Sequence, residues 1–178
     1  VAPFLRVGTE RALDWGPVYD LDQWNPEFFE RLHGFLSLAN KYGIIVEISL
    51  FGNQFVSEIW RLCPLHFKNN VNFVENVEWI DFMTMRHKRL LQYQCRYVTK
   101  IVQEVNQYDN IFFEICNEPF TKNSMMEKYP QQELNDWQMY IADLIRRTEN
   151  QMENQHLVAG QAAWLHNDNG LIPIDQPT

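Results

Sequence analysis

The hydrophobic positions of this chain repeat with a helical period in some segments and form short continuous runs in others. Helical spacing predicts three helices, at residues 25–43, 84–107 and 131–154. Continuous apolar, β-prone runs predict three strands, at residues 44–51, 111–117 and 156–163. Helix and strand therefore alternate along most of the chain.

The first helix has clear signals at both ends. Asn25 can cap the free N–H groups, and Pro26 fits the first helical position. Gly43 suits the position just after a helix. Apolar residues recur at spacings of three and four and predict one buried face: Phe28, Leu32, Phe35, Leu36 and Ala39.

Strand–helix alternation predicts right-handed crossovers and a parallel sheet, which places the chain in the α/β class. The strands are almost continuously apolar, as expected when helices cover a sheet. Long irregular segments follow the first two strands, at residues 52–80 and 119–130. Functional loops of parallel α/β folds gather at the carboxyl ends of the strands, so these two segments are the first places to look for a site.

Composition narrows the function classes. The net charge is −8 over 178 residues, which argues against a nucleic-acid partner, because phosphate binding relies on clustered Lys and Arg. No apolar run reaches membrane-spanning length, so we expect no membrane partner. The three cysteines are widely spaced and predict neither a metal site nor a disulfide framework. There is no glycine-rich phosphate loop, and we expect no cofactor.

The strongest candidate for chemistry is the end of the second strand. The apolar run from Ile111 ends abruptly in Asn117-Glu118-Pro119. A carboxyl group at the boundary between a buried strand and solvent can have its pKa raised by partial desolvation, and it can then act as a general acid. The competing interpretation is an ordinary surface carboxylate at the start of a loop.

This run, Phe113-Glu114-Ile115-Cys116-Asn117-Glu118-Pro119, resembles the fourth barrel strand of clan A retaining glycoside hydrolases. The chain from about Pro3 to Ala163 looks like strands two or three to five of a family 5-like, cellulase-type barrel. The resemblance implies a partial TIM (β/α)8 barrel with parallel strands and a carbohydrate substrate. It also implies that Glu118 is the acid/base and that Asn117 contacts the sugar 2-hydroxyl.

Further polar and aromatic residues near the strand ends are candidates for binding sugar. Polar groups between tryptophans suit a sugar groove, where rings stack and hydroxyls bond. The substrate-binding candidates are Asn53, Trp60, His66, Trp79 and Trp164. The alternative for the tryptophans is a loop packed by its own aromatics, and His66 also fits a structural hydrogen-bonding role. Glu47 and Glu114 lie within apolar strands, so each requires a partner or a proton.

The resemblance leaves the second catalytic carboxylate unassigned. The family's nucleophile ends its seventh strand, and Asp168 and Asp175 follow the third predicted strand too closely to replace it. A complete barrel takes about 250 residues. We therefore expect residues 1–178 to form a single partial catalytic domain, a fragment that is inactive alone and that can self-associate through open barrel edges.

Two other functions fit the same sequence. The first is a non-catalytic carbohydrate-binding module with an aromatic groove, and the second is an unrelated parallel α/β domain in which Glu118 is incidental. The residues leave the compartment open, while the family resemblance implies an extracellular or periplasmic location.

Overall fold

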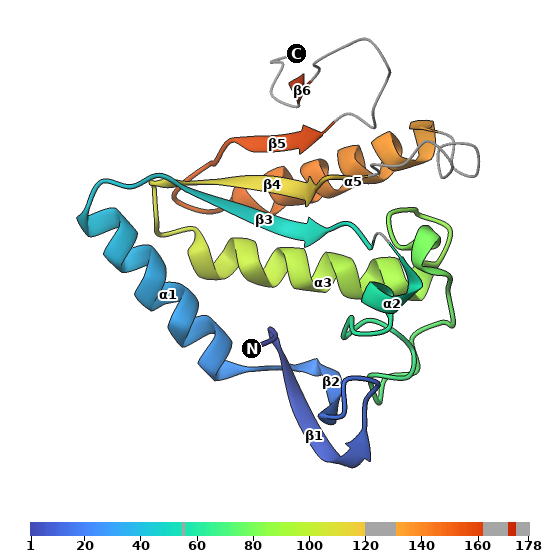
Figure 1. The fold of residues 1–178 in the computed structure, drawn as a ribbon. Coiled ribbons are helices and arrows are strands. Elements are labelled where there is room, and N and C mark those ends of the chain that lie inside the picture. Colours follow the sequence, from blue (N-terminus) through green and yellow to red (C-terminus); the bar gives the residue numbers. More distant parts are fainter. Residues whose placement is uncertain (55, 120–130, 162–170, 174–178) are drawn as a thin grey trace.

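The computed structural model describes residues 1–54, 56–119, 131–161 and 171–173. Within them a hairpin at the amino end leads into alternating helices and parallel strands (Figure 1). The hairpin and the first helix–strand unit consist of β1 Phe4–Arg11, β2 Pro17–Trp24, α1 Pro26–Lys41 and β3 Val46–Gly52. After β3 come α2 Ser57–Trp60, the short 3-10 helix η1 Trp79–Asp81, α3 Lys88–Val105, β4 Ile111–Asn117, α5 Gln131–Glu149, β5 Val158–Gln161 and β6 Leu171–Pro173.

The predicted sheet is confirmed and extended. β3, β4 and β5 are parallel neighbours, with Ser49 opposite Glu114 and Gly52 opposite Asn117. β6, which lies beyond the predicted strands, joins the edge of β5 in the antiparallel sense. Hydrophobic periodicity provides no signal for β6, because a strand of three residues is too short to show one.

The antiparallel β1–β2 hairpin was also missed. The hydrophobic pattern predicts no helix or strand before residue 25. Register shifts interrupt the pairing between Arg6 and Arg11, so the two strands do not show a simple alternation of apolar and polar residues. The hairpin is tied to the segment after β3, because the Tyr19 N–H donates to the Asn69 carbonyl over 2.7 Å and the Val71 N–H donates to the Tyr19 carbonyl over 2.9 Å.

Helix α1 begins and ends where its signals predicted. The Asn25 side chain accepts a hydrogen bond from the Glu27 N–H over 3.2 Å, and Gly43 has a φ of 65°. Its buried face is narrower than predicted. Leu36 and Ala39 are buried, but Phe35 is 58% exposed and Phe29 is buried instead. Residues 35 and 36 lie about 100° apart around a helix, so one packing surface does not cover both.

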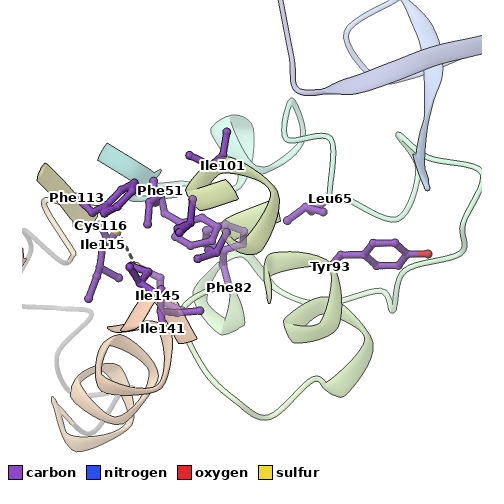
Figure 2. Packing of buried hydrophobic residues seen from close by; sticks show 14 of the residues in the cluster. Phe51, Leu65, Phe82, Tyr93, Ile101, Phe113, Ile115, Cys116, Ile141 and Ile145 are labelled. Carbon is purple, nitrogen blue, oxygen red and sulfur yellow. Dashed lines mark hydrogen bonds between the residues drawn. The ribbon is translucent and has the colours of Figure 1, made fainter. Parts of the chain in front are cut away.

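The core lies between the sheet and helices α3 and α5, which pack against each other. Phe113 and Ile115 of β4 are completely buried, as are Trp137, Ile141 and Ile145 of α5. Figure 2 shows several of these side chains converging with Phe51 and Phe82, and the ring centroids of Phe51 and Trp137 are 5.3 Å apart. This burial fixes β4 rigidly, and β4 carries the Asn-Glu-Pro motif at its end.

Candidate active site

The Asn-Glu-Pro motif lies where β4 leaves the core. From Phe113 to Cys116 the strand is buried, whereas Asn117 and Glu118 are exposed and Pro119 is buried again. Glu118 therefore extends from a fixed backbone into solvent at the carboxyl end of a parallel strand. This is the edge of a parallel sheet at which active sites of α/β folds form.

Glu118 has an unusual backbone conformation. Its φ is 49°, in the left-handed region that non-glycine residues seldom occupy. For an L-residue with an ordinary side chain this conformation costs roughly 1–2 kcal/mol. The regular alternation of side chains along β4 therefore stops at Asn117, where the strand ends. Local strain of this kind gathers at functional sites, where surrounding contacts hold it in place.

Asn53 connects the ends of β3 and β4. Its backbone N–H donates to the Asn117 carbonyl over 3.2 Å. Its side-chain Nδ2 donates to the Glu118 carbonyl over 2.7 Å. The structure thus brings together three of the predicted site residues: Asn53, Asn117 and Glu118. The parallel register of Gly52 opposite Asn117 causes this meeting, because it places the residues that follow each strand side by side.

A polar network crosses the sheet below the motif. Glu114 is 6% exposed, and its carboxylate accepts hydrogen bonds from the Ser49 hydroxyl over 2.5 Å and from the Gln161 amide over 2.6 Å. Each of the three side chains comes from a different strand. Both donors are neutral. The buried Glu114 carboxylate is therefore satisfied by hydrogen bonds from Ser49 and Gln161 and not by a basic side chain. Ser49 and Gln161 were missed because a lone serine or glutamine provides no sequence signal.

Glu47 is the second acidic residue within a strand. It lies on the same face of β3 as Ser49. Desolvation raises the pKa of Glu47, and so do the charge of Glu114 and a hydrogen bond with it. The two carboxyl groups therefore interact across the strands. Glu47 is itself exposed, so solvent screens this interaction.

Trp60 and His66 make their contacts within the segment after β3. Trp60 is 3% exposed, and its indole N–H donates to the Val77 carbonyl over 3.0 Å. Its ring packs against Phe82 and against the ring of His66. The faces of this tryptophan are thus covered by protein, as expected for a loop packed by its own aromatics.

His66 has a structural environment. It is buried, and its Nδ1 accepts a hydrogen bond from the Lys68 N–H over 3.2 Å. Its carbonyl accepts a bond from the Asn70 amide over 2.9 Å. Desolvation lowers the pKa of His66, and the charges of Lys68 and Arg61 lower it further. A neutral imidazole that organises its own loop explains all these contacts.

The two remaining tryptophan candidates differ in where they lie. Trp79 begins η1 and is half-buried against the core, so part of its surface stays open to solvent. Trp164 lies outside the described residues.

The described residues contain no group of three or more His, Cys, Asp or Glu side chains that could hold a metal ion. Within the same part of the chain, no helix has the length and apolar character needed to span a bilayer.

Comparison with known proteins identifies the family. No curated protein and no solved structure matches the chain. The family model Cellulase (glycosyl hydrolase family 5) matches residues 5–177. The TIM barrel is the fold of that family, and the parallel β3–β4–β5 sheet with its helices is consistent with part of such a barrel, which confirms the expected fold class. The chain therefore belongs to glycosyl hydrolase family 5.

Proposed function

We propose that Glu118 is the acid/base of a retaining glycoside hydrolase and that residues 1–178 form one partial catalytic domain of that enzyme. The observation that carries this proposal is the exposed Glu118 carboxylate at the carboxyl end of a strand whose preceding residues are buried. A carboxyl group held there has a fixed position and access to substrate, which general acid catalysis requires.

The chemistry has two steps. In the first, the protonated Glu118 carboxyl gives its proton to the glycosidic oxygen, while a second carboxylate attacks the anomeric carbon and the sugar–oxygen bond breaks. In the second, the Glu118 carboxylate takes a proton from water, the water oxygen bonds to the anomeric carbon, and the nucleophile is released. We also propose that the exposed Asn117 contacts the sugar 2-hydroxyl, a contact that strengthens in the transition state.

None of the described strand ends supplies the nucleophile of this mechanism. Retention requires two carboxyl groups about 5–5.5 Å apart. Among the described residues, β3 is followed by Asn53 and β5 ends at Gln161, neither of which is acidic. We therefore propose that the nucleophile comes from elsewhere in the barrel and that the 178-residue chain alone hydrolyses little.

The open edge of the sheet supports a proposal about association. β3 is at the end of the strand order, so one of its edges has no partner strand in the described residues. Exposed strand edges are templates for pairing with another chain. We propose that the isolated chain self-associates at this edge, which concentration-dependent sedimentation would detect.

The product of the complete reading frame provides the test of catalysis. Glu118→Gln keeps the size of the side chain but removes the proton donor, so kcat/KM for β-linked oligosaccharides should fall by roughly 10²–10⁴-fold. Proton NMR of the first product formed should show the anomeric configuration of the substrate. Glu30→Gln, the same change at an exposed position of α1, is the control and should keep full activity.

Two outcomes would contradict the proposal in different ways. Full activity of Glu118→Gln would remove Glu118 from the mechanism. Strong hydrolysis by the purified 178-residue chain, lost in Glu118→Gln, would keep Glu118 but show that the nucleophile lies within this chain.

A further inference from the structure

Asn53 contacts two consecutive peptide carbonyls, those of Asn117 and Glu118. The sequence suggested that Asn53 binds sugar. Its side chain is not available for this, because the residue is 5% exposed and its amide N–H already donates to the Glu118 carbonyl over 2.7 Å. These contacts fit a residue that positions Glu118 better than they fit a residue that binds substrate.

Chemistry allows only one orientation of the Asn53 amide. If the amide were turned over, Oδ1 would lie 2.7 Å from the Glu118 carbonyl oxygen, and two acceptors would repel each other. In the observed orientation Oδ1 is buried and has no hydrogen-bond partner among the described residues. A buried acceptor without a partner is unfavourable. The amide keeps this orientation nonetheless, which indicates that its bond to Glu118 determines how it lies.

The two hydrogen bonds from Asn53 act on the peptide units that flank the Glu118 Cα, and these units set the direction of the Glu118 side chain. Glu118 has a φ of 49°, a conformation that a glutamate leaves readily unless its neighbours hold it. One hydrogen bond from Asn53 fixes the carbonyl before Glu118, and the other fixes the carbonyl of Glu118 itself. Together they restrain the backbone on both sides of the Glu118 Cα, and hence the path of its carboxyl group.

We infer that Asn53 is a positioning residue, which holds Glu118 in its left-handed conformation so that the carboxyl group reaches the glycosidic oxygen. This inference rests on the proposed function of Glu118 as the acid/base. Asn53 touches neither the substrate nor the reacting atoms. Its loss should therefore impair proton donation rather than sugar binding.

The test compares two substrates in the product of the complete reading frame. An oligosaccharide needs its leaving oxygen protonated, whereas a dinitrophenyl glycoside has a leaving group that departs without a proton. With Asn53→Ala, kcat/KM for the oligosaccharide should fall by roughly 10–100-fold, because a small misplacement of a catalytic group has an effect of this size. The fall for the dinitrophenyl glycoside should be less than about 3-fold.

Asn53→Leu supplies a second variant of nearly the same size and shape, which serves if Asn53→Ala folds poorly. The isobutyl side chain that it introduces cannot donate to the Glu118 carbonyl, so the same selective loss is expected. The control is Gln54→Ala, in which the neighbouring amide loses its bond to the Gly52 carbonyl. It should leave both substrates unaffected.

Three outcomes separate this inference from the function on which it rests. Equal losses on both substrates, or none, in the Asn53 variants would overturn the positioning role. If Glu118→Gln shows the selective loss and the Asn53 variants do not, the positioning role alone is wrong. If Glu118→Gln leaves both substrates unaffected, the proposed function is wrong and the positioning role with it.

Discussion

The two ends of the parallel strands are organised in opposite ways. At the carboxyl end, Glu118 is exposed and left-handed, and Asn53 has a buried oxygen without a described partner. At the amino end, which lies at the left of Figure 1, buried polar groups are joined in one network. There the His156 and Glu149 side chains are 3% and 2% exposed, and their closest nitrogen and oxygen atoms are 2.6 Å apart.

The network at the amino end pairs the groups that it buries. His156 Nδ1 faces the Glu149 carboxylate, and Nε2 lies 2.7 Å from the Tyr108 carbonyl oxygen. Both ring nitrogens face acceptors, so the imidazolium form suits the site. The Asn106 amide donates to the carbonyl of Asn154 and to Glu149. The amino end therefore contributes stability. The carboxyl end retains backbone strain at Glu118, the proposed acid, and a buried Asn53 oxygen without a partner among the described residues.

The largest effect on folding should come from breaking the buried ion pair. Glu149→Ala leaves the His156 imidazolium buried without its carboxylate and should lower the free energy of unfolding by roughly 3–5 kcal/mol. Urea denaturation of the 178-residue chain would measure this. Glu153→Ala, at an exposed position nearby, is the control and should change stability by less than about 0.5 kcal/mol. A loss below about 1 kcal/mol in Glu149→Ala would mean that the amino end does not carry the stability assigned to it.

The same pair should make stability depend on pH. Desolvation lowers the pKa of His156, but hydrogen bonds to Glu149 and to the Tyr108 carbonyl, together with the charges of Glu149 and Asp109, raise it more, and the net pKa is raised. The Phe113 ring, edge-on at 5.6 Å, carries no charge.

The raised folded-state pKa of His156 fixes the sign of its contribution to the free energy of unfolding. It is complete below the unfolded pKa of about 6.5 and is lost as pH rises through the folded pKa. The stability advantage of the wild type over His156→Asn should therefore shrink above about pH 6.5, by at most about 1.4 kcal/mol per pH unit. Unfolding curves between about pH 6 and 9 test this. An advantage that grows with pH would reverse the assigned protonation state.

At the carboxyl end, relief of strain should stabilise the chain. Asn tolerates the left-handed region better than Glu, so Glu118→Asn should raise the free energy of unfolding by up to about 1 kcal/mol while it removes the acid. Glu118→Ala keeps the Cβ penalty and should show no such gain. Thermal unfolding of both variants provides the measurement, and equal stabilities would show that the φ of Glu118 stores no energy.

The smallest expected effect is that of Asn117→Ala. Asn117 is exposed, so its truncation should change the free energy of unfolding by less than about 0.5 kcal/mol. The matched change at the other end, Asn106→Ala, removes a buried amide from the network and should cost roughly 1–3 kcal/mol. Chemical denaturation of the two variants would test this directly, and similar losses would erase the contrast between the ends.

The sequence predicted those parts of the fold that depend on local signals. The limits of α1 followed from Asn25, Pro26 and Gly43, and β4 followed from its apolar run. Membership of family 5 confirms the resemblance that the Asn-Glu-Pro run suggested. The hairpin β1–β2 was not predicted, because register shifts mask its period.

Of the candidate site, it was mainly Glu118 that could be predicted from the sequence. Glu118 stands out because a charge follows a buried run, and that signal is local. Trp60 and His66 looked equally suitable from their composition and spacing, yet tertiary packing buries both. The burial of Trp60 depends on Phe82 and Val77, which contact it across the folded segment between β3 and α3. Residue type alone carries no information about such contacts.

The sequence was enough to derive the alternation of elements, the family and the place of Glu118 at a strand end. Capping, periodicity and a motif each depend on residues that are close together in the chain. The folded chain was needed to show that Asn53 lies against Glu118 and that Ser49 and Gln161 satisfy Glu114. These contacts join residues 47 to 65 positions apart in the chain. The register of the parallel strands creates them, because it brings residues that are distant in the sequence to the same end of the sheet.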